Sequence, residues 1–251
     1  MIRYSLLAVA ATAASSAAFA QEIPEKPWRA AIELGAISTT GNTETLSVQS
    51  NVDITHDMEH WQNEYIASVL FKEDEIVQQD GTETTEKTAE KYFVSAKTAY
   101  KLNEDYSNLF LFGSYTDDQF GAFEKYTTVS FGYGARWLDA PTMFLDAEFG
   151  PGYFRGERVT QNETIEVESG LMARGALKFQ WQLTDSATFT QDVSVETGSD
   201  NTRTISETAL ATKISDTLQM KVGYSIFHNT DVAPDKEEMD TTTFITLVYN
   251  L

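Results

Sequence analysis

The stretch Glu166–Leu183 reads EVESGLMARGALKFQWQL, and its side chains alternate between two kinds. One set is mainly apolar or small: Val167, Ser169, Leu171, Ala173, Gly175, Leu177, Phe179, Trp181 and Leu183. The other set is mainly polar or small: Glu166, Glu168, Gly170, Met172, Arg174, Ala176, Lys178, Gln180 and Gln182. Because successive side chains of a strand point to opposite faces of a sheet, this pattern predicts one long strand between an apolar and a polar wall.

The same period of two recurs to the end of the chain, and no segment after residue 20 has a convincing helical period. We predict twelve strands, near residues 28–38, 44–57, 61–72, 91–102, 108–117, 125–138, 142–155, 166–183, 187–197, 203–214, 218–228 and 241–251. Most exceed the roughly 5–6 residues of an ordinary soluble strand. They are long enough to cross a bilayer, which takes about 9–11 residues in a tilted strand.

The connections between these strands differ according to their position in the chain. The first, third, fifth and later odd connections include long ones, at 39–43, 73–90, 118–124, 156–165, 198–202 and 229–240. The even connections are short, at 58–60, 103–107, 139–141, 184–186 and 215–217. Long extracellular loops that alternate with short periplasmic turns are typical of outer-membrane barrels. The predicted fold is therefore all-β, a transmembrane up-and-down antiparallel β-barrel of about 12 strands.

All four tryptophans fall on the apolar face near the short-turn end of their strands. Trp28 and Trp61 open strands there, and Trp137 and Trp181 close strands there. Tryptophan prefers the boundary between membrane and water, so these residues predict a periplasmic aromatic girdle.

The first twenty residues form a separate unit. Arg3 gives a positive start, Leu6–Ala14 is an apolar run, and Ala18-Phe19-Ala20 has small residues at both cleavage-determining positions. This order predicts a secretory signal peptide at residues 1–20, with the barrel domain at 21–251.

The chain has 18 Lys and Arg residues against 38 Asp and Glu, a formal net charge of −20, and no cysteine. The acidic balance excludes a phosphate backbone as partner, so we expect no nucleic-acid binding. Half of the net charge comes from two predicted loops: 73–90 has seven acidic residues against one lysine, and 229–240 has five against one. Such oxygen clusters are compatible either with divalent cations or with ordinary solvated loops.

Charged residues of both signs fall on the polar face, which we expect to line the lumen. The candidates are Arg29, Glu33, Asp53, Glu64, Lys97, Lys101, Arg136, Asp146, Glu148, Glu168, Arg174, Lys178, Asp192 and Lys221, with Glu196, Glu207 and Lys213 on the same face. Because buried charges need partners, a mixed lumen predicts a network of ion pairs and a narrow or plugged barrel.

No pattern of catalytic or cofactor-binding residues stands out, so we expect no catalytic residue, cofactor or metal centre. His56 and His60 flank a short turn, whereas His228 lies at the opposite rim, which argues against a three-histidine metal site. Gly132, Gly134, Gly150 and Gly152 lack the lysine of a phosphate loop, and we expect them to leave space or to bend adjacent strands.

The chain resembles the salt-induced outer-membrane protein family, a bacterial family of unknown molecular function. The resemblance rests on Thr40-Gly41-Asn42-Thr43, Glu90-Lys91-Tyr92-Phe93, Gly150-Pro151-Gly152-Tyr153, Trp181-Gln182-Leu183-Thr184-Asp185, Phe189-Thr190-Gln191-Asp192, Ser206-Glu207-Thr208-Ala209-Leu210 and Leu247-Val248-Tyr249. It implies an outer-membrane location and a β-barrel architecture.

The function expected from the sequence is a non-enzymatic outer-membrane barrel, acting as a small-solute or ion channel or as a structural envelope component linked to salt or osmotic adaptation. The alternatives are an outer-membrane lipid-modifying enzyme and a soluble periplasmic ligand-binding barrel. The expected partners are outer-membrane lipid and lipopolysaccharide, the barrel-assembly machinery during insertion, and small solutes or divalent cations.

Overall fold

The computed structural model describes residues 27–39, 45–77, 83–102, 106–159, 164–199, 201–232 and 237–251. These residues form twelve strands: β1 Trp28–Thr39, β2 Thr45–Asp57, β3 Trp61–Val77, β4 Glu83–Lys101, β5 Asn108–Asp118, β6 Lys125–Ala140, β7 Met143–Val159, β8 Ile165–Gln182, β9 Ala187–Thr197, β10 Thr202–Lys213, β11 Leu218–Asn229 and β12 Met239–Asn250. The signal peptide predicted at 1–20 lies outside the described residues, as do Thr40–Thr43.

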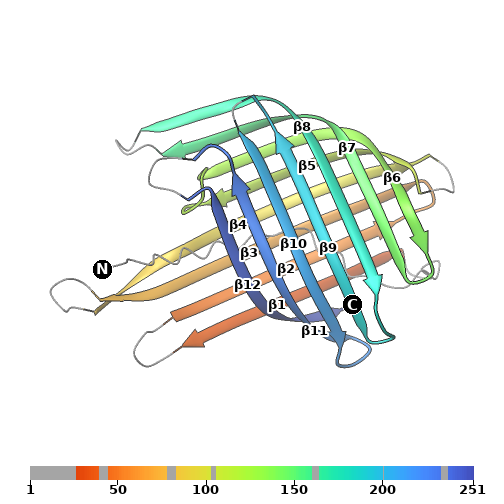
Figure 1. Ribbon diagram of the computed structural model, residues 1–251, viewed down its shortest axis with the longest axis horizontal. Coiled ribbons are helices and arrows are strands. Elements are labelled where there is room, and N and C mark those ends of the chain that lie inside the picture. The colour runs from red at the N-terminus through yellow and green to blue at the C-terminus, as the bar shows by residue number, and fades with distance from the viewer. Residues whose placement is uncertain are drawn as a thin grey trace.

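Each strand pairs antiparallel with its neighbours in sequence, and β1 pairs with β12 to close the sheet (Figure 1). The closing register joins Ala31–Leu34 of β1 to Leu247–Asn250 of β12. Closure leaves no edge strand, so every strand has a partner on both sides. The predicted fold class, an all-β antiparallel barrel of twelve strands, is confirmed.

The wall has an apolar outside and a polar inside. In β8, Leu171, Leu177 and Trp181 are exposed on the outer surface, whereas Arg174 and Gln180 are buried inside. The four tryptophans Trp28, Trp61, Trp137 and Trp181 are all exposed on the outside, close to one end of the barrel. We call this the turn end, because the short connections 58–60, 141–142, 183–186 and 214–217 lie there; the opposite end is the loop end.

One expected loop, 73–90, is largely strand, and a second, 156–165, is half strand, which corrects the sequence analysis. The predicted loop 73–90 shrinks to 78–82, because β3 continues to Val77 and β4 begins at Glu83. In the same way, β7 continues to Val159 and β8 begins at Ile165. The β3–β4 and β7–β8 hairpins therefore project beyond the rest of the loop end (Figure 1). The acidic stretch forms ion pairs within this extension, Lys72 with Asp74 and Lys87 with Glu90, each 2.6 Å between nitrogen and oxygen.

Candidate functional site: the charged interior of the barrel

Eleven charged side chains from nine strands share one band of the lumen, which we call the charge belt. Its members are Glu33, Asp53, Glu64, Lys97, Glu148, Arg174, Lys178, Asp192, Glu196, Glu207 and Lys221. The alternation of each strand directs these residues inward, because the apolar residues between them occupy the lipid-facing wall.

Lys97 joins two distant parts of the wall. Its Nζ lies 3.2 Å from Glu64 Oε2 on β3 and 2.7 Å from Glu148 Oε1 on β7. Strands β5 and β6 separate β4 from β7, so the second ion pair crosses the lumen. Arg174 extends the series, with Glu148 at 3.6 Å and Glu196 at 3.7 Å. Charges of alternating sign thus connect β3 to β9.

Lys221 forms the second centre of the belt. Its Nζ lies 2.9 Å from Glu207 Oε1 and 3.3 Å from Glu33 Oε1, and all three side chains are buried. The Thr246 hydroxyl donates a further hydrogen bond of 3.4 Å to Glu33 Oε2. This lysine thereby joins β10 to β1 across β12, next to the seam where the barrel closes.

Lys178 lies between the two halves of the belt. It is opposite Asp192 of β9 in register, and its charge also acts on Asp53 of β2 and Glu64 of β3. The belt contains seven carboxylates against four cations, so it is acidic overall.

The remaining candidates lie outside the belt. Towards the turn end, Arg136 donates two hydrogen bonds to Asp146, of 2.7 and 3.0 Å, and Lys101 donates one of 2.5 Å to Asp57. Arg29 of β1 is also there, opposite Thr55.

Two candidates are far from these pairs. Glu168 is nearer the loop end, where its Oε2 lies 3.1 Å from Arg158 Nη2. Lys213 is exposed at the last position of β10, so it does not contribute to the enclosed lumen.

The lumen is more open around Lys97 than around the Lys91–Asp118 pair nearer the loop end. Lys97, Glu64 and Glu148 keep side-chain exposures of 18%, 20% and 15% inside a closed wall. Nearer the loop end, Lys91 and Asp118 pair at 3.1 Å with side-chain exposures of only 4% and 6%. The part of the belt around Lys97 is therefore less tightly packed than the Lys91–Asp118 pair, whereas Lys221, Glu33 and Glu207 are as buried as that pair.

Residues 119–124, which connect β5 to β6, account for this packing. Phe123 is 6% exposed and forms a buried cluster with Tyr126, Phe154 and Met172. Its ring lies directly over Gly156 of β7, where an added Cβ would come within 2.5 Å of the ring. The absence of a side chain at Gly156 thus makes room for Phe123 inside the barrel.

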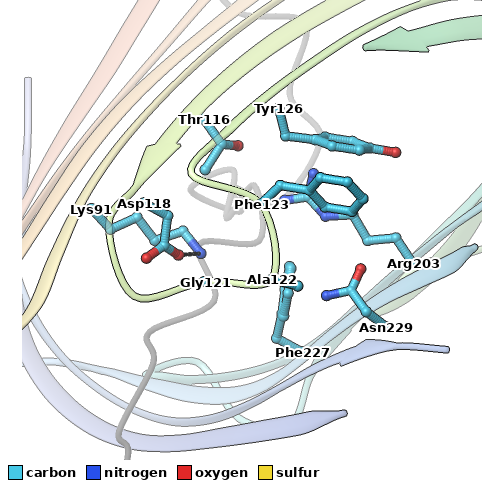
Figure 2. A pocket seen from close by; sticks show the side chains of 10 residues that line it. All are labelled: Lys91, Thr116, Asp118, Gly121, Ala122, Phe123, Tyr126, Arg203, Phe227 and Asn229. Atoms are coloured by element: carbon cyan, nitrogen blue, oxygen red, sulfur yellow. Dashed lines mark ion pairs between the residues drawn. The ribbon is translucent and has the colours of Figure 1, made fainter. Parts of the chain in front are cut away.

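Cations and aromatic rings surround Phe123. Arg158 lies over the Phe123 ring at 4.5 Å, and Arg203 lies over Tyr126 at 4.4 Å and over Phe227 at 4.9 Å. Figure 2 shows Lys91 and Asp118 on one side of this packing and Arg203 with Asn229 on the other. The contacts of Arg158 and Arg203 with these rings are cation–π contacts, which stabilise most where water is excluded.

Sequence analysis missed the residues of this outer half: Lys91, Asp118, Phe123, Arg158 and Arg203. The sequence pattern did not identify Arg203, because the alternation in β10 is weak. The outer face of β10 carries the polar residues Ser206 and Thr208, which hydrogen-bond to Gln191 at 3.0 and 2.5 Å. The other four lay at predicted strand ends or in predicted loops, where a period of two gives no signal.

The glycines of β6 and β7 have a structural role. An added Cβ on Gly132 would lie 2.1 Å from the Phe149 oxygen, and one on Gly150 would lie 1.9 Å from the Phe131 oxygen. The two backbones approach too closely there for any side chain, so glycine at both positions permits this close approach of β6 and β7.

The histidines lie apart. His56 stacks on Trp28 with ring centroids 3.8 Å apart, and His228 is opposite Thr204 and Met239 in register on the outer wall. Within the described ranges, no group of three or more His, Cys, Asp or Glu residues could hold a metal ion. No helix in that same part of the chain is long and apolar enough to span a membrane.

Fold and interior together define the class: a closed, lipid-compatible barrel of the outer-membrane type. The chain belongs to the family described as "Protein of unknown function, DUF481", which matches residues 32–251. It is 29% identical over 228 residues to the uncharacterized protein YdiY of Escherichia coli K12, covering 90% of this chain and 84% of that protein. The resemblance to an outer-membrane barrel family of unknown function is thereby supported, whereas its salt-induced character is not shown.

Three solved structures show similar folds. They are an outer-membrane channel, COG4313, from Pseudomonas putida F1 (TM-score 0.54, 9% identity, 94% of this chain and 99% of that one), the NanC porin (0.51, 9%, 88% and 98%) and the translocator domain of the autotransporter NalP from Neisseria meningitidis (0.50, 14%, 91% and 90%). At these identities the likeness concerns the fold alone.

Proposed function

We propose that this protein is a narrow, non-enzymatic channel of the bacterial outer membrane for ions and small polar solutes. The charge belt carries the proposal. A band of charged groups inside a closed wall, partly exposed around Lys97, offers polar species a path through the hydrocarbon and offers none to apolar ones.

The outer wall supports the location. Large apolar residues cover it from strand to strand, among them Leu171, Phe131 and Phe149. In water such a continuous apolar surface would drive aggregation, whereas lipid accommodates it. This favours a membrane barrel over the alternative of a soluble periplasmic barrel. Its partners would then be outer-membrane lipid and lipopolysaccharide, and the assembly machinery during insertion.

The packing at the loop end supports a restricted channel. Phe123 and its neighbours occupy the outer half of the lumen, and the Lys97–Glu148 ion pair spans the middle. We expect them together to limit passage to small species, with residues 119–124 as the restricting element. The excess of carboxylates in the belt favours cations over anions.

Swelling of proteoliposomes in a graded series of neutral solutes tests this proposal. The wild-type protein should admit only the smallest solutes, and Phe123→Ala should admit larger ones, because its ring fills the outer lumen. Leu111→Ala, on the lipid-facing side of β5, is the control and should match the wild type. No swelling with either wild type or Phe123→Ala would favour the structural envelope role instead.

The enzymatic alternative has less support. His228 lies on the outer wall, but its register partners are Thr204 and Met239, and no serine lies directly opposite. The link to salt adaptation rests on family resemblance, and messenger levels after a shift to high sodium chloride would test it: an increase is expected, and unchanged levels would contradict it.

A further inference from the structure

The packed outer half of the lumen contains a small, partly open cavity against residues 121–123. Its lining includes Lys91, Thr116, Asp118, Tyr126, Arg203 and Asn229 (Figure 2). About 10 Å³ is open to the centre of a water-sized sphere, and the cavity itself extends beyond that by the radius of the sphere. The space therefore suits a single small occupant, such as one water molecule or one monatomic ion.

Two polar groups of this lining are buried without a hydrogen-bond partner among the described residues. Arg203 is 6% exposed, and its Nε makes no hydrogen bond there; Thr116 is 3% exposed, and the same holds for its Oγ1. Leaving a buried donor unsatisfied costs roughly 1–3 kcal/mol, and more for a charged group. The lining thus has free donor capacity on two strands, β5 and β10.

The side chains around the cavity carry more positive than negative charge. Lys91 and Arg203 contribute two positive charges, and Asp118 contributes one negative charge that pairs with Lys91 at 3.1 Å. Within the described residues Arg203 has no carboxylate within ion-pair distance; Glu196, its register partner on β9, pairs with Arg174 instead. The rings of Tyr126 and Phe227 stabilise the Arg203 cation, and Tyr126 also hydrogen-bonds to it, but neither residue carries a negative charge that would balance it.

We propose that this cavity binds one small monovalent anion of the size of chloride. The Arg203 N–H and the Thr116 hydroxyl donate to it, and the positive excess balances its charge. A cation would face two positive side chains, and an organic anion would exceed the volume. The bound anion joins β5 to β10 beneath Phe123 and so stabilises the packed outer half. The site does not require conduction, so it can be tested apart from the channel.

Thermal unfolding in detergent gives the first test, in sodium chloride, sodium bromide and sodium gluconate at equal ionic strength. The halides should raise the Tm above the gluconate value, by about 2–4 °C when halide is several-fold above its Kd. Arg203→Gln and Thr116→Val should each abolish the difference. Thr116→Val keeps the side-chain volume and leaves the charges around the cavity unchanged. It therefore tests the proposal even if Arg203→Gln does not fold. Arg155→Gln, an exposed arginine at the same end, should keep the full difference.

Crystals of the full barrel soaked in sodium bromide give the second test. The proposal expects one anomalous peak in the cavity, within hydrogen-bonding distance of Arg203 Nε. Water alone at that position, or equal Tm values in all three salts, would overturn it. A halide effect that persists in both cavity variants would also overturn it, because the anion would then bind elsewhere.

Discussion

Gly156 determines how far Phe123 enters the lumen. With an added Cβ 2.5 Å from the ring, Gly156→Ala must displace the Phe123 side chain from its packed position. We expect this variant to raise single-channel conductance in planar bilayers. Gly170→Ala on the adjacent strand is the matched control, because its added Cβ would meet Phe154 at 3.7 Å, an ordinary contact. Equal conductance of the two variants would show that Phe123 does not restrict the channel.

Lys221 compensates two buried carboxylates, Glu33 and Glu207. Lys221→Met leaves both without their cation, and breaking a buried ion pair in this way costs about 3–5 kcal/mol. Urea unfolding in lipid vesicles would measure the loss. Lys213→Met removes an exposed lysine from β10 and should change the free energy of unfolding by less than about 0.5 kcal/mol. A comparable small effect for Lys221→Met would mean that the triad contributes little to stability.

At the scale of the strands, the lipid-facing wall should be sensitive to charge according to depth. Leu177 lies within the membrane-spanning part of β8, whereas Ile165 begins that strand in the projecting hairpin. Arginine on the lipid face costs about 2–4 kcal/mol at mid-membrane and about 0–1 kcal/mol near the interface. Leu177→Arg should therefore destabilise the folded protein in vesicles far more than Ile165→Arg. Equal effects would contradict a membrane-embedded wall.

The orientation of the hairpins gives a second prediction at this scale. A short epitope inserted after Gly81, between β3 and β4, should bind antibody on intact cells, because loop ends face outward in such barrels. The same epitope after Asp185, between β8 and β9, should bind only after the cells are permeabilised. The reverse labelling would show that the barrel has the opposite orientation in the membrane, with the tryptophan girdle at the cell surface.

The number and order of the strands could be predicted from the sequence, because lipid imposes an apolar face on every strand that crosses it. The hairpin extensions could not. Residues 73–77 and 83–90 belong to the projecting hairpin, where we expect neither face to meet lipid, so charged side chains occupy both faces and the period of two disappears. Strand residues such as Glu73 and Glu86 were therefore expected in a loop.

The whole molecule decides which interior charges meet. Alternation indicates that Lys97 and Glu148 face inward, but their 2.7 Å contact depends on the curvature of the wall across β5 and β6. The same holds for Phe123, since a six-residue connection can lie outside the barrel or fold into it. Pairing in the lumen is a property of barrel closure, and no local pattern encodes it.

The net charge of −20 is distributed unevenly over the barrel. Much of the acidic excess lies in the β3–β4 hairpin and beside β12, at the loop end, whereas the lumen pairs most of its charges. The outer wall stays nearly free of charge. An acidic rim over a paired interior fits a barrel that attracts cations to its mouth.

The most direct test of a narrow, polar channel is single-channel recording of the purified wild-type protein in planar bilayers, with a potassium chloride gradient across the membrane. We predict small, discrete conductance steps with a reversal potential on the cation-selective side. Silence in the wild type and also in Gly156→Ala would contradict the proposed channel.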